Sequence, residues 1–337
     1  QPVTSDSLLS SMKSVGVEGM DEFFNDWVNT PGWPHFSIDS LRRLPQNQWK
    51  VFFRQKSNGN MHNYQKVPFT ISFRDAESRL EERSVKLSGP LDSAIVTLPF
   101  EPIMAYLNRD EKTSFAVTGE EHFIKVTGNV NWPEAFVEID TRSISDSAFL
   151  RVEHHFVGPD AIPGENPPYK LSPNRYWKVY GTMPEGFHAR AKWVYNGRKP
   201  SPLGSMGNGW LDTGFTYDER LITLLYRKDS RDNWKPAKAT QSMLASVVDM
   251  YGYFMLDTLL PGEYSFAETL GPMGLQDKFA EFEEANPLHL FPNPASGDVN
   301  ILLNLAPGNQ AMSIEIRDLQ GRIVLSQNLS EGTQTCS

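Results

Sequence analysis

Apolar residues recur with a helical period near the start of this chain. Leu8, Leu9 and Met12 lie on one side of a predicted helix over residues 5–15, which ends at Gly16. A second helix is predicted over residues 17–28, and its apolar side chains are Met20, Phe23, Phe24, Trp27 and Val28. Proline and glycine at positions 31, 32 and 34 end this helix, because both disfavour helical continuation.

From Trp49 onward the apolar period shortens to two residues, which is typical of strands. Strands are predicted over residues 49–54, 67–73, 84–87, 94–100 and 103–107. A second group is predicted over residues 122–126, 136–140, 149–156, 176–180, 188–195, 221–227, 252–257 and 264–267, with a short helix over residues 237–248. The sequence therefore predicts a mainly β protein: a short N-terminal helical segment, tandem β-sandwich domains of the immunoglobulin/fibronectin-like kind and a small C-terminal β domain.

The residues at the end of the second helix form a distinctive sequence motif. Phe23, Phe24, Trp27 and Val28 are followed at fixed spacing by Pro31, Gly32 and Pro34. This motif resembles the one found in aminopeptidase N-like (gluzincin) zinc metallopeptidases where the helical catalytic domain ends and a β-sandwich begins. The resemblance implies that residues 1–37 are the last helices of a truncated catalytic domain and that residues 38–117 are the β-sandwich of that family. Residues 118–270 would then form a second β-sandwich.

The same resemblance places the chemistry of the parent protein outside this chain. The paired-histidine zinc motif H-E-x-x-H does not occur in the sequence. We therefore expect Zn²⁺ and the peptide substrates to bind in the missing upstream catalytic domain, and we assign no catalytic, cofactor-binding or metal-binding residue in this chain. The expected role of the chain is to support that catalytic body.

A different resemblance follows a predicted linker at residues 271–287. Residues 288–337 resemble the C-terminal sorting domain of the type IX secretion system, and the residues that carry the resemblance are Phe291, Pro292, Asn293, Pro294, Gly297, Asp318 and Gly321. The resemblance implies export by the secretion machinery and a location outside, or on the surface of, a Gram-negative bacterium. Such domains continue through further strands, so we expect this one to be truncated.

Composition excludes some classes of partner. The formal net charge of −9, without a basic run, argues against nucleic acid. No apolar stretch reaches the length of a membrane-spanning helix. The single cysteine, Cys336, cannot form an internal disulfide or a cysteine-based zinc site. Because the chain starts at Gln1 without a methionine or a signal-peptide pattern, we interpret it as part of a longer protein.

Glu153, His154 and His155 are the most suggestive local cluster of ionisable residues. On a strand, Glu153 and His155 share one face while His154 points the other way. A metal site would need further ligands from neighbouring strands, and residues in such a pattern are more often satisfied or solvated surface side chains. Three other histidines are set aside, as structural (His35) or as lacking an evident partner (His62 and His122).

The aromatic residues of the second β block allow a rival interpretation. They are Trp132, Tyr169, Trp177, Trp193, Trp210 and Trp234. If they were exposed in one plane they could form a sugar-binding platform, although aromatic residues that alternate along strands are more often core. The alternative function is therefore a carbohydrate- or protein-binding β-sandwich module of a bacterial cell-surface protein that carries the same sorting domain.

Overall fold

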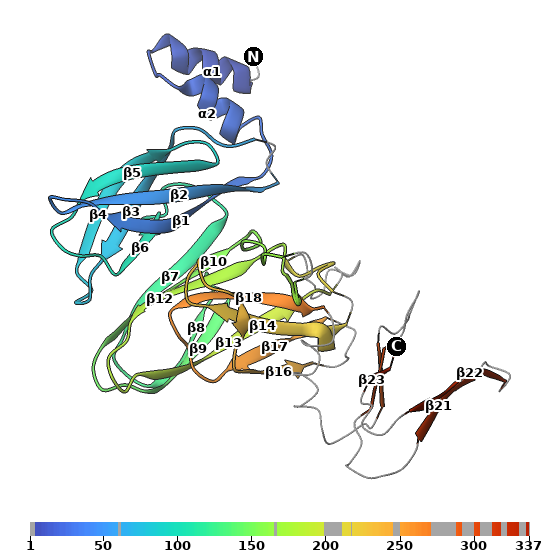
Figure 1. Cartoon of the computed structure of the whole chain (residues 1–337). Helices are drawn as coiled ribbons and strands as arrows, with labels where there is room; N and C mark the ends of the chain where they lie inside the picture. Colours follow the sequence, from blue (N-terminus) through green and yellow to red (C-terminus); the bar gives the residue numbers. More distant parts are fainter. Residues whose placement is uncertain are drawn as a thin grey trace. The chain divides into compact units, whose positions relative to one another are not determined.

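The computed structural model describes residues 4–59, 62–164, 167–198, 211–216, 218–244, 250–270, 288–291, 300–303, 312–317, 322–329 and 335–336. The chain divides into two compact units, Gln1–Leu270 and Gly271–Ser337. The described residues are mainly in strands, as the alternating pattern predicts (Figure 1).

The N-terminal segment contains the two predicted helices, α1 (Ser5–Ser14) and α2 (Met20–Trp27). Thr4 caps α1, because its hydroxyl accepts a hydrogen bond of 3.2 Å from the backbone N–H of Ser7. The hydroxyl of Ser7 in turn accepts a 2.9 Å bond from the N–H of Thr4. Gly16 has a φ of 81°, a left-handed conformation that ends α1 and that glycine adopts without strain.

The first sheet pair consists of two antiparallel sheets, ordered β1-β2-β5 and β4-β3-β6. Its strands are β1 (Trp33–Arg43), β2 (Gln48–Asn58), β3 (Val67–Arg74), β4 (Leu80–Leu87), β5 (Leu91–Thr97) and β6 (Met104–Leu107). Alternate side chains, such as Val51 and Phe53 of β2 and Ile71 of β3, point into one core. The alternating pattern does not predict β1, because a bulge between Ile38 and Ser40 breaks its period. This strand begins inside the segment 1–37 that the resemblance assigns to helices.

The second sheet pair packs a larger sheet, ordered β15-β14-β18-β12-β10-β7 with β11 beside β18, against a smaller one, ordered β16-β17-β13-β9-β8. The larger sheet contains β7 (Val117–Ile124), β10 (Ala148–His155), β11 (Tyr169–Leu171), β12 (Tyr176–Thr182), β14 (Ile222–Arg227), β15 (Lys235–Pro236) and β18 (Gly262–Thr269). The smaller contains β8 (Gly128–Trp132), β9 (Val137–Ser143), β13 (His188–Asn196), β16 (Ala239–Met243) and β17 (Tyr251–Leu256). Side chains from both sheets form one core, in which the rings of Trp177 and Trp193 lie 6.1 Å apart.

The helix predicted over residues 237–248 is wrong where the structure describes it. Residues 239–243 form β16, which pairs with β17 from Ala239 opposite Leu256 to Met243 opposite Gly252. Cross-strand pairing therefore overrides the local helical tendency of this segment.

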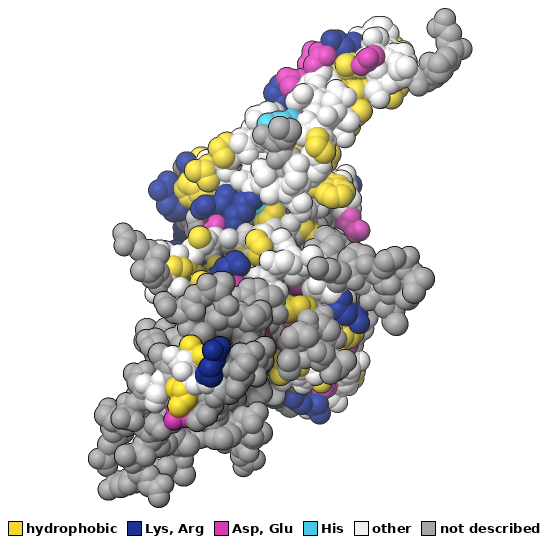
Figure 2. All heavy atoms as spheres, turned by 90° about the vertical axis from the view of Figure 1, so that its right-hand side faces the viewer, with side chains coloured by type: hydrophobic (Ala, Val, Ile, Leu, Met, Phe, Trp, Pro, Cys, Tyr) yellow, Lys and Arg dark blue, Asp and Glu magenta, His cyan; other side chains and the backbone are white. Residues whose placement is uncertain are grey.

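Helix α2 attaches the helical segment to the first sheet pair. The ring of Trp27 packs edge-on against that of Tyr64, with centroids 5.0 Å apart, and Phe24 is only 4% exposed. Phe23 is 46% exposed, so the apolar stripe of α2 is only partly covered. Helix α1 buries none of its side chains. Figure 2 accordingly shows hydrophobic side chains on the surface of the helical segment at the top of the view, beside acidic and basic ones.

Asp26 makes the polar part of this attachment. Its buried carboxylate accepts a hydrogen bond of 2.9 Å from the backbone N–H of Gln65 and lies 2.7 Å from Nε2 of His62. The expectation that His62 has no evident partner is therefore wrong, because its partner is 36 positions away in the sequence.

The C-terminal unit contains short strands. β19 (Leu288–Phe291), β20 (Asn300–Leu303) and β23 (Thr335–Cys336) form one sheet, and β21 (Met312–Arg317) pairs with β22 (Ile323–Leu329) as a hairpin. The hairpin contains a register shift between Ile316 and Arg317.

Candidate functional site

Strand β10 has protein on both of its faces. All of its residues from Ala148 to His155 are buried. His154 faces the core of the second sheet pair, where its ring lies 5.3 Å from that of Trp177. Glu153 and His155 face residues of the first sheet pair. The predicted alternation is thus confirmed, but the expectation of surface side chains is wrong, because the first sheet pair covers this face of the strand.

His155 contacts a histidine from the other sheet pair. Nε2 of His35, on β1, lies 2.8 Å from Nδ1 of His155, so the N–H of one ring donates a hydrogen bond to the bare nitrogen of the other. Burial lowers the pKa of His35 well below its ordinary value, and the proximity of His155 acts in the same direction. Burial also lowers the pKa of His155, against the opposing effect of Glu153. Both rings are therefore neutral at neutral pH. The expectation that His35 is structural agrees with its complete burial.

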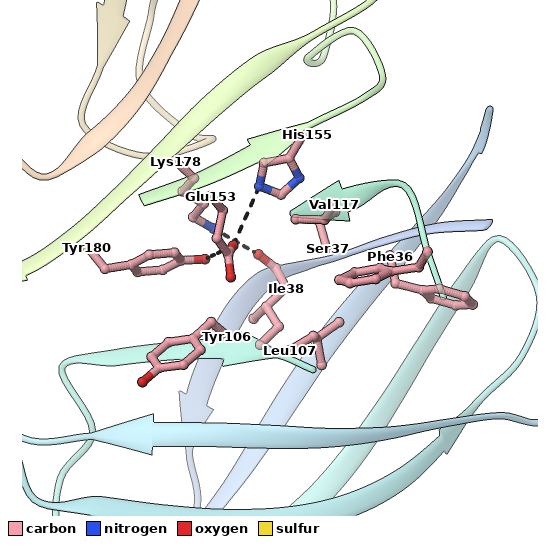
Figure 3. Close-up of a pocket in the computed structure, with 11 residues that line it drawn as sticks. Phe36, Ser37, Ile38, Tyr106, Leu107, Val117, Glu153, His155, Lys178 and Tyr180 are labelled. Carbon is pink, nitrogen blue, oxygen red and sulfur yellow. Dashed lines mark hydrogen bonds and ion pairs between the residues drawn. The ribbon is translucent and has the colours of Figure 1, made fainter. Parts of the chain in front are cut away.

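Glu153 is the buried charge at the centre of the site (Figure 3). Its carboxylate accepts hydrogen bonds of 3.0 Å from Nε of Arg151 and 3.2 Å from the hydroxyl of Tyr180, and it lies 3.5 Å from Nε2 of His155. Burial is the largest single influence and favours the protonated acid, but Arg151, His155 and Lys178 together outweigh it and lower the pKa of Glu153 to about 2. Lys178 lies beside this group and donates a 3.3 Å bond to the backbone carbonyl of Ile38 on β1. Glu153 is therefore ionised, and each of its carboxylate oxygens accepts a hydrogen bond.

A second carboxylate, Glu121 on β7, extends the network toward β3 and β6. It accepts hydrogen bonds of 3.0 Å from Arg74, 2.7 Å from Nε of Arg109 and 2.9 Å from the hydroxyl of Tyr106. Arg151 lies 3.5 Å from the same carboxylate. Burial opposes ionisation, but the arginines outweigh it and lower the pKa of Glu121. We call Glu121, Glu153 and the arginines that they bind, with His35 and His155, the junction network.

Sequence reasoning could not find most of the junction network. Arg151 and Glu153 lie two residues apart, so a strand places them on one face, and this signal was available. Arg74 and His35 come from strands of the other sheet pair, and nothing local in the sequence links them to β10.

The junction network encloses almost no free space. The cavity beside Glu153, lined by Phe36, Ile38, Tyr106 and His155 among others, is about 10 Å³, roughly the volume needed by one water molecule. No substrate therefore fits beside Glu153. Where the structure describes the chain, it places no set of three histidine, cysteine or carboxylate side chains suitably for a metal ion. The arrangement is suited to joining the two sheet pairs rather than to chemistry on a ligand.

The other histidine considered, His122, also has partners. Its Nε2 lies 3.3 Å from a carboxylate oxygen of Glu120, and its ring lies 4.5 Å from that of Trp132. The expectation that His122 has no evident partner is therefore wrong.

The aromatic residues proposed as a sugar platform do not share an exposed plane where they are described. Those buried in the second sheet pair are Trp132, Trp177, Trp193 and Trp234. Tyr169 is half-buried, and Trp210 lies outside the described residues. A cavity of about 410 Å³ lies instead against the outer side of β13 and β9, with Phe136, Val194 and Lys192 in its lining.

The residues that carry the sorting resemblance fall largely outside the described part. Phe291 is the last residue of β19, whereas Pro292, Asn293, Pro294, Gly297, Asp318 and Gly321 are outside the described residues. Their proposed role as a sorting signal stays a prediction.

Comparison with known proteins supports one of the two resemblances. Residues 289–337 match the family described as a secretion system C-terminal sorting domain. This type IX sorting domain indicates a secreted or cell-surface protein, and the predicted location is thereby confirmed. No curated protein and no solved structure matches the chain. The aminopeptidase N-like resemblance has no counterpart among these findings and stays a prediction. In the described portion, neither α1 nor α2 has the length and apolar character needed to cross a bilayer.

Proposed function

We propose that this chain is the non-catalytic C-terminal region of a secreted protein, in which the two sheet pairs act as a rigid support and residues 288–337 act as an export address. The match of residues 289–337 to a sorting domain carries the export part of the proposal. The support role follows from the junction network, which joins β10 of the second sheet pair to β1 through the buried His35–His155 contact and joins β7 to β3 and β6 through the hydrogen bonds of Glu121. A joint of this kind favours one relative orientation of the two sheet pairs.

The parent protein in this proposal is an aminopeptidase N-like zinc metallopeptidase. This proposal is supported by the sequence motif from Phe23 to Pro34 and by the exposed apolar side chains of α1 and α2. Leu8 and Phe23 are 45% and 46% exposed, and Val15 is 77% exposed. A short helix that buries none of its side chains gains little from its own hydrogen bonds, so these helices suit the margin of a larger helical body. Zn²⁺ and peptide substrates would bind in that body.

Two experiments test the proposal separately. Sequencing the coding DNA upstream should reveal H-E-x-x-H with a further glutamate on the next helix, and a complete upstream domain without them would rule out the peptidase parent. Deletion of residues 288–337 should leave the protein inside the cell envelope, as shown by fractionation and immunoblotting. The variant Cys336→Ser is the control and should be exported normally, because it alters one small side chain of the address. Normal export of the deleted protein would contradict the address.

A binding module of a cell-surface protein is the second candidate function. The cavity of about 410 Å³ favours it, because it has the size of a small-molecule site and combines Phe136 and Val194 with the Lys192–Glu138 ion pair. A glycan array probed with the purified chain tests this reading. Binding that Phe136→Ala abolishes would support it, and the absence of binding would leave the supporting role as the better proposal.

A further inference from the structure

Strand β8 is an edge strand without the usual protection. It is the last strand of the smaller sheet and pairs with β9 along Gly128–Trp132; within the described parts of the chain no strand pairs with its other side. Natural edge strands are commonly blunted by charged residues, proline or bulges. The five residues Gly-Asn-Val-Asn-Trp contain no charge and no proline. The backbone groups on the free side of β8 can therefore accept another strand.

The core of the second sheet pair is also open at this edge. Val130 and Trp132 lie on the same side of β8, because they are two residues apart. Trp132 is buried in the core, whereas Val130 is 49% exposed although it faces the same way. A cavity of about 160 Å³ lies between β7 and β8, and its lining includes Ile124, Val130, Trp132 and Ile139. An added strand would cover apolar surface as well as satisfy backbone groups.

The sequence of β8 indicates that the strand added to its free side is a second copy of β8. Read from Val130 in either direction, the neighbouring residue is asparagine. Two copies of β8 paired antiparallel about a two-fold axis at Val130 would place valine opposite valine and Asn129 opposite Asn131 of the other copy. The asparagine amides can then exchange hydrogen bonds on the outer face. The strand is uncharged although the whole chain has a net charge of −9, so this edge does not repel a second copy.

We propose that two copies of this chain associate through β8, which extends the smaller sheet across a two-fold axis at Val130. Each Val130 covers the open core edge of the other copy, and the interface is the same patch on both chains. The inference is independent of the export and peptidase proposals, because it rests only on the geometry of β8 and its neighbours.

Sedimentation velocity of the whole chain tests the proposal, with the expectation of a concentration-dependent dimer. Val130→Lys should raise the dissociation constant at least ~10-fold, because two like charges would then face each other across the axis. Ile95→Lys is the matched control: Ile95 is 58% exposed on β5, the edge strand of a sheet in the first sheet pair, and this change should leave the dimer intact. A wild-type chain that stays monomeric at its highest soluble concentration, or a dimer that Val130→Lys does not weaken, would overturn the proposal.

A charge-swap experiment locates the axis and guards against misfolding. Val130→Lys and Val130→Glu should each be monomeric alone, whereas their mixture should form a heterodimer, because opposite charges then lie directly across the axis. Val130→Cys in a Cys336→Ser background should form a disulfide-linked dimer on mild oxidation, since directly opposed strand residues lie within reach of a disulfide. Ile95→Cys in the same background should not. Failure of both the heterodimer and the cross-link would show that β8 is not the contact.

Discussion

Nε2 of His35 and Nδ1 of His155 lie 2.8 Å apart, although 120 positions separate the two residues in the sequence. The contact joins β1 of the first sheet pair to β10 of the second, and it is completely enclosed. Burial disfavours the charged form of both rings, so the contact holds two neutral imidazoles at neutral pH. The stability of the junction network should therefore depend on pH in a range where few other groups titrate.

The free energy of unfolding should fall as the pH drops below about 6.5. Burial is the main cause that lowers the folded-state pKa values of His35, His154 and His155. Below their unfolded-state pKa, the unfolded chain binds protons that the folded chain excludes, so the stabilisation is complete above that pH and is lost below it. Each histidine should contribute a slope of about 1.4 kcal/mol per pH unit. Urea unfolding at about pH 7.5 and about pH 5.5 measures the effect, and equal stabilities would contradict it.

Replacing His154 by phenylalanine should stabilise the protein. Both ring nitrogens of His154 are buried and have no hydrogen-bond partner among the described residues. The ring lies between Phe136, Phe156 and Trp177, at centroid distances of 4.5, 4.4 and 5.3 Å. An apolar ring suits these neighbours and removes unpaired polar atoms, so His154→Phe should raise the free energy of unfolding by about 1 kcal/mol.

His155→Phe is the matched control on the opposite face of the same strand. It removes the hydrogen bond to His35 and the contact with Glu153, so it should lower the free energy of unfolding by about 2–4 kcal/mol. Denaturant midpoints of the two variants should therefore move in opposite directions. Similar losses in both would mean that aromatic packing, and not polar pairing, decides the effect.

Glu121→Gln should be strongly destabilising. The substitution leaves the guanidinium groups of Arg74, Arg109 and Arg151 close together without their shared carboxylate. Arg74 and Arg151 are buried, but Glu121 is only partly buried and Arg109 is 37% exposed, so the loss should be about 2–3 kcal/mol, less than for a fully buried pair. Glu138→Gln is the comparison: its ion pair with Lys192 lies at the surface, so the cost should stay below about 1 kcal/mol. Equal stabilities of the two variants in urea would refute the proposed role of Glu121.

Two of the three aromatic residues of α2, Trp27 and Phe23, should also differ in their effect on stability. Trp27 packs on Tyr64 and on the core of the first sheet pair, so Trp27→Ala should cost about 2–4 kcal/mol. Phe23 is largely uncovered, and Phe23→Ala should cost less than about 1 kcal/mol. Thermal unfolding of the purified variants tests the difference. A large loss for Phe23→Ala would show that this side chain is covered in solution.

Local periodicity accounts for the elements that were predicted and for those that were missed. The alternation around Val51 and Ile71 marks β2 and β3, because each strand has one face on a core. The pattern does not predict β1, because the bulge after Ile38 shifts its register. It predicts a helix in place of β16, because the partner strand β17 is a separate segment of the chain. These are properties of pairing, which a single segment does not encode.

The candidate site was predicted less well than the fold, for a related reason. The alternation of Glu153, His154 and His155 was predicted correctly because it depends only on strand geometry. Their burial is not predicted by the sequence, because it depends on β1 and β6 of the first sheet pair, whose residues cover Glu153 and His155. Arg151 is on the same strand as Glu153, but the arginines that bind Glu121 include Arg74 of β3, and the sequence gives no sign that β3 meets β7.

Limited proteolysis should separate the chain between Leu270 and Leu288. The intervening residues 271–287 contain a glycine- and proline-bearing start and four acidic residues, a composition typical of a linker, and they connect two units that are compact by themselves. Within this stretch the only lysine or arginine is Lys278, whereas Glu281, Glu283 and Glu284 offer sites to a glutamate-specific protease. Trypsin and the glutamate-specific protease should therefore release fragments that end a few residues apart.

The variant Lys278→Gln makes the same experiment specific. It should abolish the early tryptic cut and leave the glutamate-specific cut unchanged, because only the recognition residue is altered. Intact mass spectrometry of the large fragment should then place its end within residues 271–287, with the preceding sheet pairs resistant. Early cuts within β7–β18 while residues 288–337 persist would show that the C-terminal unit is an integral part of the folded body. An address that is recognised by other proteins is more accessible when it folds apart from its cargo, and for this reason the position of the first cut bears directly on the sorting role.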